Sequence, residues 1–207
     1  MFPFFSFAQK QFQTVFGGNN EEQSRSVIQT ENNDYLVLGM TTSFGSGDKD
    51  ISITRIDTNG IIIWSKVLGT SIRDAAYDLK INPTGGYMIA AWVLNDPPTY
   101  DDWYIIKIDD NGNILSETFF GGYHDDEIMD MELTINGEYM LVGGTWSFAN
   151  YLVDICIARM DQNLNLLWTK TFGAGLREYS RAVTRCSDGG FIIIGGQRDY
   201  NDQNNRI

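Results

Sequence analysis

The chain has 207 residues, 43% of them hydrophobic and 20% charged, which excludes an intrinsically disordered protein and is enough for one domain with a sizeable core. Its 15 basic and 27 acidic side chains give a net charge of −12, so we expect no nucleic-acid partner and no docking on anionic lipid. No stretch approaches the roughly 20 consecutive apolar residues of a membrane-spanning helix, and we expect no membrane span.

The N-terminal residues Met1–Ala8 are apolar and end in Ser-Phe-Ala, a sequence similar to a signal-peptide cleavage site. They lack the basic residues and the length of a complete signal peptide. Two interpretations stay open, the remainder of an export signal and an apolar strand.

An internal repeat of 52 residues organises the chain from about Phe12 onward. Its clearest marker is the motif Phe16-Gly17-Gly18. Counterparts of this motif begin at Leu68, Phe120 and Phe172, each 52 residues after the one before. Many other positions keep the same interval without a single insertion, which composition alone does not explain. We therefore expect a single domain over residues 1–207, with repeats that begin near residues 16, 68, 120 and 172.

Each repeat is predicted to hold four strands, because Val, Ile, Thr and aromatic residues gather in four short runs. In the first repeat these runs are Ser26–Thr30, Tyr35–Thr41, Asp50–Ile56 and Ile61–Leu68. Their later counterparts are Ala76–Asn82, Tyr87–Val93, Asp102–Ile108 and Ile114–Phe120; Glu127–Thr134, Tyr139–Thr145, Asp154–Met160 and Asn165–Phe172; and Arg181–Cys186 and Phe191–Gly196. No segment shows a sustained helical period, so we expect almost no helix.

The turn between the third and fourth strands has its own signature. Asp57-Thr58-Asn59-Gly60 and Asp109-Asp110-Asn111-Gly112 combine an aspartate that caps its own turn with residues that tolerate positive φ. The third copy, Asp161-Gln162-Asn163-Leu164, has no glycine. We expect that third turn to be looser.

Four-stranded antiparallel units repeated in tandem are typical of β-propellers, in which each sheet covers the face of its neighbour. The predicted fold class is all-β, a β-propeller built of four-stranded antiparallel blades, with about four blades in this chain. In the register of the repeat, Phe12–Phe16 matches a fourth strand and belongs with the last repeat or with a neighbouring chain. Three alternatives follow: a four-bladed ring closed within one chain, a larger ring or fibre of several chains, and a piece of a longer propeller.

Three segments resemble the tandem propeller repeats of large secreted or surface bacterial proteins: Trp168–Gly173, Ser187–Gly196 and Asp154–Asp161. The Asp57…Gly60…Trp64 arrangement is similar to the docking motif of quinoprotein-type propellers, which implies locking between sheets. The resemblance implies an extracellular or cell-surface location.

We interpret the chain as a non-enzymatic binding or scaffold module. Its expected partner is a protein or a glycan, further copies of the chain included, as in a surface layer or filament. The alternative is a propeller enzyme of quinoprotein-like or hydrolase type. Quinoprotein dehydrogenases carry a disulfide between neighbouring cysteines, whereas Cys156 and Cys186 are far apart in the sequence.

Four acids recur at the 52-residue interval, in the loop that enters each first strand. They are Glu22, Asp74, Asp126 and Glu178. Either they line a common channel mouth and bind a cation such as calcium, or each accepts hydrogen bonds from backbone N–H groups of its own loop. No catalytic residue, no metal-ligand set and no cofactor other than calcium is expected.

Two further segments depart from the repeat. The stretch Tyr123–Glu127 contains the only histidine, His124, beside three acids, and is interpreted either as a ligand or acid–base group or as a solvated loop. The loop Leu94–Asp101 precedes Trp103 and Tyr104. Divergent loops with aromatic residues often form a binding edge, although the same content fits a proline-stiffened loop.

Overall fold

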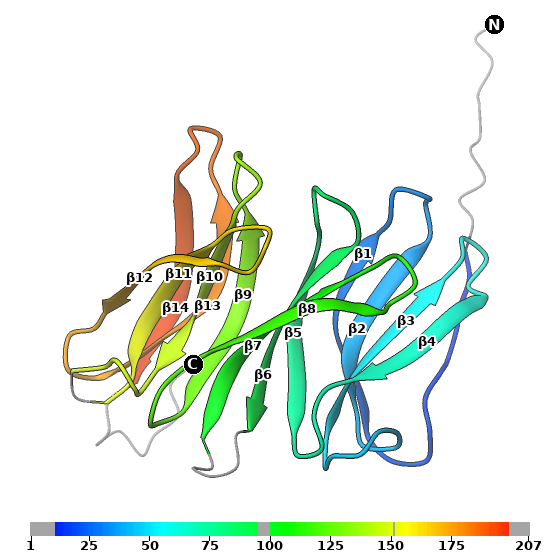
Figure 1. The fold of residues 1–207 in the computed structure, drawn as a ribbon, viewed down its shortest axis with the longest axis horizontal. Coiled ribbons are helices and arrows are strands. Elements are labelled where there is room, and N and C mark those ends of the chain that lie inside the picture. The colour runs from blue at the N-terminus through cyan, green and yellow to red at the C-terminus, as the bar shows by residue number, and fades with distance from the viewer. Residues whose placement is uncertain (1–10, 95–99, 151, 199–207) are drawn as a thin grey trace, which may run out of the picture.

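The computed structural model describes residues 11–94, 100–150 and 152–198, and Met1–Ala8 lies outside them. The described residues contain fourteen β-strands and no helix, which confirms the all-β prediction (Figure 1). The strands form three four-stranded antiparallel sheets and one two-stranded sheet. In each sheet the strands pair in the order in which they follow along the chain.

The first sheet contains β1 (Glu22–Gln29), β2 (Tyr35–Thr41), β3 (Asp50–Ile56) and β4 (Ile62–Leu68). The second contains β5 (Asp74–Ile81), β6 (Tyr87–Leu94), β7 (Asp101–Ile108) and β8 (Ile114–Phe120). The third contains β9 (Asp126–Leu133), β10 (Tyr139–Thr145), β11 (Asp154–Met160) and β12 (Leu166–Phe172). The fourth contains β13 (Arg177–Arg185) and β14 (Phe191–Arg198).

The first strand of every sheet is longer at its N-terminal end than the sequence predicts. The pairing of each first strand with its second strand shifts register at one place, so that a single residue has no partner opposite it. The residues skipped in this way are Arg25, Tyr77, Met129 and Arg181, all at the same position of the repeat. Each is a β-bulge, which lets the strand continue with its alternation of faces reversed.

Small residues stand opposite the bulges. A Cβ atom added to Gly39, Gly143 or Gly195 would collide with a carbonyl oxygen of the facing first strand. The second sheet has Ala91 at this position. The repeated Gly, Ala, Gly, Gly pattern therefore marks the place where the backbone of the bulged strand comes close.

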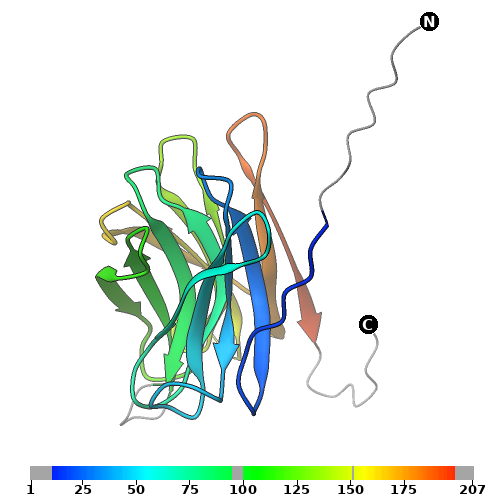
Figure 2. The same ribbon diagram turned by 90° about the vertical axis from the view of Figure 1, so that its right-hand side faces the viewer.

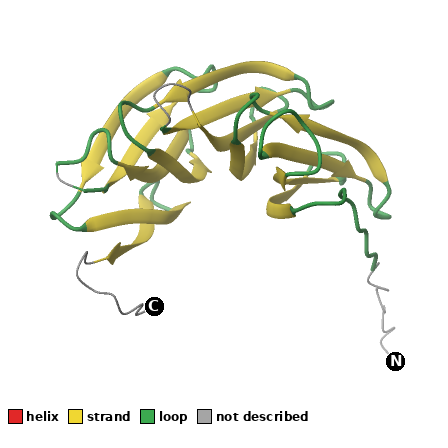
Figure 3. Ribbon diagram, turned by 90° about the horizontal axis from the view of Figure 1, so that it is seen from below, coloured by secondary structure: helices red, strands yellow, loops and turns green. Residues whose placement is uncertain are grey.

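The sheets follow one another along an arch (Figures 2 and 3), and their first strands contact one another in turn. Strand β1 lies against β5, β5 against β9, and β9 against β13. Each sheet has an apolar face toward each neighbour, and three cores fill the three gaps. In the first core, for example, Leu36 and Leu38 pack with Leu79 and Ile89. The described residues do not close the arch into a ring.

Carboxylates join neighbouring first strands across the gaps. Asp78 Oδ2 accepts a hydrogen bond from the backbone N–H of Met131 at 3.3 Å, and Asp130 Oδ2 accepts one from the N–H of Val183 at 2.7 Å. Asp78 and Asp130 are 52 residues apart, so the same bond is made twice at equivalent places. At the first gap Ser26 Oγ donates to Asp78 Oδ1 at 3.1 Å.

The segment Phe12–Phe16 does not form the predicted strand. It lies against its own first sheet, where Thr14 Oγ1 donates to the Gly60 carbonyl at 2.6 Å and the Phe12 and Tyr35 rings are 5.8 Å apart. Every fourth strand in this structure pairs with a third strand. The fourth sheet has no third strand among the described residues, so the segment has no such edge to join.

The third of the turns between third and fourth strands is not looser than the others. Asp161 Oδ1 accepts from the N–H groups of Asn163 and Asn165 at 2.8 and 2.9 Å, just as Asp109 Oδ1 accepts from two N–H groups of its own turn at 2.9 and 2.8 Å. Leu164 takes the positive φ of 67° that glycines take in the other two turns, and its side chain is buried in the second core. Apolar burial offsets the backbone strain here.

The Asp130 carboxyl makes stability depend on pH. Burial and the nearby Asp78 raise the pKa of Asp130 from 3.8 to about 6. Because its pKa is raised in the folded protein, the Asp130 carboxyl stabilises the fold in its protonated form. This contribution is complete below about pH 4 and is lost as the pH rises through 6. Asp130→Asn keeps an acceptor for Val183 without the charge.

We expect Asp130→Asn to raise the free energy of unfolding at pH 7.5 by about 1 kcal/mol, since partial solvent exposure limits the gain. It should also flatten the dependence on pH between 4 and 7 relative to the parent protein. Urea unfolding at several pH values measures both. Identical pH profiles for the two proteins would show that Asp130 titrates normally.

Candidate functional site

The four repeated acids each close their own turn. Three of them are the first residue of β1, β5 or β9, and Glu178 is the second residue of β13, so they stand inside the strands and not in the loops before them. Each carboxylate accepts a hydrogen bond from the backbone N–H four residues earlier. These bonds join Gly18 to Glu22 at 3.0 Å, Thr70 to Asp74 at 2.6 Å, Gly122 to Asp126 at 2.9 Å and Ala174 to Glu178 at 3.0 Å. Each acid therefore makes the backbone hydrogen bond that is expected of a residue that caps its own turn.

These acids are not gathered around one point. Among residues 11–94, 100–150 and 152–198, no group of three His, Cys, Asp or Glu side chains is arranged to hold a metal ion. Burial raises the pKa of Asp74, whereas hydrogen bonds from Ser43 and Gly18 lower that of the exposed Glu22. The repeated acids thus differ in environment but share one structural contact.

Trp103 and Tyr104 are core residues. Their side chains are 1% and 2% exposed, and they point into the second and the first core respectively. Tyr104 donates its hydroxyl to Glu117 and stacks on Phe119 with ring centroids 4.7 Å apart. The structure places neither aromatic residue at a binding edge.

The two segments that depart from the repeat do meet. The rings of Tyr100 and His124 contact edge to face at 5.4 Å, and the N–H of Asp101 donates to Asp125 Oδ1 at 3.2 Å. Residues 95–99 of the predicted loop lie outside the described residues. Arg73 joins this group through Asp101, with 3.5 Å between guanidinium and carboxylate. The His124 ring thus contacts Tyr100, and the neighbouring Asp125 joins its loop to Asp101 of the second sheet.

A pocket beside this group is lined by arginines and aromatic rings. It has a volume of about 220 Å³ and lies between the third and fourth sheets, near their first strands. We call it the arginine pocket. Its lining residues are Tyr77, Glu127, Met129, Gly144, Trp146, Val153, Arg177, Tyr179, Arg181 and Arg198.

Three bulges supply the wall of the arginine pocket: Tyr77, Met129 and Arg181. The Arg181 guanidinium lies 4.8 Å from the centre of the Tyr179 ring and donates to the Met129 sulfur at 3.8 Å. A guanidinium seated over a ring in this way keeps donor groups available for a planar anion. The bulges therefore aim side chains that regular strands would direct elsewhere.

The charges around the arginine pocket are mixed. Burial raises the pKa of Glu127, and so do Asp101 and Asp125, while Arg181 and Arg73 oppose the shift. Three arginines line this one pocket in a chain whose net charge is −12. Chemically, the arrangement can bind an anionic group through the Arg181 guanidinium and a flat apolar surface through the rings.

Sequence reasoning missed the arginine pocket. Its residues come from three sheets and are far apart along the chain. The signal that could have found it is the column of bulge positions, occupied by Arg25, Tyr77, Met129 and Arg181. The type of side chain changes at this position from cation to ring to thioether, whereas other positions of the repeat keep one residue type.

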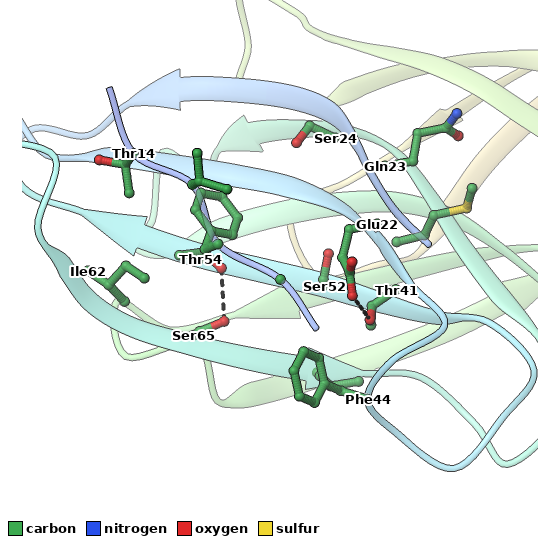
Figure 4. Close-up of a pocket in the computed structure, with 15 residues that line it drawn as sticks. Thr14, Glu22, Gln23, Ser24, Thr41, Phe44, Ser52, Thr54, Ile62 and Ser65 are labelled. Carbon is green, nitrogen blue, oxygen red and sulfur yellow. Dashed lines mark hydrogen bonds between the residues drawn. The ribbon is translucent and has the colours of Figure 1, made fainter. Parts of the chain in front are cut away.

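A larger hollow of about 580 Å³ lies over the first sheet, beneath residues 14–17 (Figure 4). Hydroxyl groups line much of it, and Thr54 and Ser65 hydrogen-bond to each other at 2.9 Å. In the register of the repeat, this face of the sheet matches the faces by which the later sheets contact the sheet before them. We therefore regard the hollow as part of an uncovered sheet face, not as a small-molecule site.

No protein-family model matches the chain, and a search of curated proteins finds no relative. The described residues include no helix long and apolar enough to cross a membrane.

The acids provide a test of the two interpretations given above. Asp126 is fully buried and accepts hydrogen bonds from Gly122 and Ser147. We expect Asp126→Ala to lower the free energy of unfolding by about 1 kcal/mol, as for a lost cap. Adding calcium chloride should leave the melting temperature of the parent protein unchanged. A calcium-dependent rise in the parent that disappears in Asp126→Ala would instead support a cation site.

Proposed function

We propose that the chain is part of a β-propeller that functions as a non-enzymatic extracellular binding or scaffold module. The propeller assignment is supported by sheets that follow the chain order, converge at their first strands and bury both faces of the middle sheets. The extracellular location is supported by the resemblance of Ser187–Gly196 and its companion segments to secreted and surface repeats.

The arginine pocket is the observation that carries the binding role, and we propose an acidic glycan as its ligand. A guanidinium pairs with a carboxylate through two parallel N–H donors. Trp146 offers a flat apolar face of the kind that stacks on sugar rings, and Tyr77 and Tyr179 line the same pocket with an arginine over one face of each ring. A uronic acid presents both features, a carboxylate and a ring, within the size of the pocket.

A binding role also fits the chemistry of the lining residues. Hydrolysis requires a nucleophile or an activated water with a positioned base. The lining residues include no serine, cysteine or histidine, and Glu127 is their only carboxylate. Burial raises the pKa of the Cys156 thiol to about 12, which keeps it protonated at neutral pH. These features favour recognition over catalysis.

Calorimetric titration with an oligogalacturonate tests the proposal, with a neutral oligogalactoside of equal length as the comparison ligand. We expect the acidic ligand to bind and the neutral one not to bind. Arg181→Ala should weaken binding by at least about tenfold, because a charge-assisted hydrogen bond contributes ~1.5–3 kcal/mol. Raising the salt concentration should weaken it further.

Arg185→Ala is the matched control, because Arg185 is an exposed arginine at the C-terminal end of the same strand and does not line the pocket. It should bind as the parent protein does. Equal affinity of the parent and Arg181→Ala, or equal binding of acidic and neutral ligands, would contradict the proposal. Binding of an acidic peptide but of no glycan would assign the pocket to a protein partner.

A further inference from the structure

The last sheet exposes the face that the other sheets bury. In the register of the repeat, Ile192 and Ile194 of β14 match Leu36 and Leu38 of the first sheet. The corresponding side chains of the first three sheets are at most 6% exposed: Leu36, Leu38, Met88, Ala90, Met140 and Val142. Ile192 and Ile194 are 56% and 61% exposed. We call this surface of the fourth sheet the tail face.

The first sheet exposes the opposite half of the same contact. Val27 of β1 is 62% exposed, whereas its counterparts Leu79, Met131 and Val183 are 0%, 0% and 5% exposed. Val67, on the same face, is 38% exposed. Residues 14–17 cover only part of this surface, which we call the head face.

The head face and the tail face consist of different residues, and each corresponds to the face that the other packs against between successive sheets. Within the chain, the face equivalent to the tail face meets the face equivalent to the head face at all three gaps between sheets. The surface that fits the tail face is therefore present on this same chain, at its other end. Burying the exposed apolar side chains of the two faces against each other would stabilise a contact between them.

We infer that the tail face of one copy receives the head face of a second copy, in the manner of two successive sheets. The contact is head to tail, so each copy keeps one face open and can add a further copy in the same direction. Repeated addition gives a ring if the rotation closes and a filament if it does not. This inference does not depend on the ligand of the arginine pocket.

The contact between copies should be weaker than the two contacts that join the second, third and fourth sheets within one copy. Ala182 stands in the fourth sheet where Asp78 and Asp130 stand in the second and third. The bond from a carboxylate to the N–H group of the following sheet is therefore not made at this junction. We expect association that depends on concentration and does not persist at high dilution.

Two variants test the inference because a head-to-tail contact can be blocked from either side. Val27→Asp blocks the head face and Ile194→Asp blocks the tail face. By sedimentation velocity from about 1 to about 200 μM, the range that reveals contacts of micromolar affinity, the parent protein should grow in mass with concentration. Each variant alone should remain a monomer.

An equimolar mixture of the two variants should form a dimer and nothing larger, because one intact head and one intact tail remain. Ile135→Asp is the control, since Ile135 is 78% exposed and lies in the turn between β9 and β10, outside both faces. It should associate as the parent protein does. Circular dichroism checks folding, and Val67→Asp with Ile192→Asp provides a second pair if either first variant is unfolded.

Three outcomes would overturn the inference: a parent protein that is monomeric throughout the range, variants that still associate with themselves, or a mixture that does not combine. The first would mean that these faces are not joined by a second copy. The second and third would mean that copies associate through other surfaces.

Discussion

The contact between successive first strands is the constraint on which the rest of the structure depends. A single sheet of four strands cannot bury both of its faces, so each sheet is stable only against its neighbours. Within each sheet the first strand is bulged at one residue and faces a glycine or alanine of the second strand that leaves room for its backbone, and the first strands of successive sheets lie against one another. At two of the three gaps a carboxylate, that of the buried Asp78 or the half-buried Asp130, then bonds to the N–H group of the next first strand. That bond adds a directional contact between the two strands to the apolar packing of the cores.

The same bulges produce the candidate binding surface. An extra residue in a strand leaves the ladder and turns its side chain away from both cores. Because the bulges recur at one position of the repeat, Arg25, Tyr77, Met129 and Arg181 stand in a row across the converging strands, with the Arg25 guanidinium 5.1 Å from the centre of the Tyr77 ring. The scaffold is thus repetitive, whereas the side chains it presents differ from sheet to sheet. Side chains at the bulge positions can therefore change, and with them what the surface binds, without disturbing the cores.

Much of the fold could be predicted because the 52-residue register places strands independently of local propensity. The second, third and fourth strands were located to within two residues. The start of β1 was missed because the bulge at Arg25 reverses the alternation, so the residues before it look like a loop. Trp103 and Tyr104 were misplaced because aromatic and acidic residues after a divergent loop fit a binding edge as well as a strand. The arginine pocket could not be predicted, because the packing of three sheets brings its residues together and no local pattern contains them.

Amide hydrogen exchange is the most direct measurement of the contact between sheets. In the parent protein the N–H groups of Met131 and Val183 should exchange as slowly as the most protected amides of the cores, because each bonds to a carboxylate of the preceding sheet. The Met131 N–H also donates to Asp130 Oδ1 of its own sheet at 2.9 Å. Asp130→Ala should therefore accelerate exchange at Val183 and at Met131, and Asp78→Ala should accelerate it at Met131 alone, while the amides of β4 and β12 remain as they were. If neither replacement changes exchange in the following sheet, the sheets are not joined through their first strands and the account is contradicted.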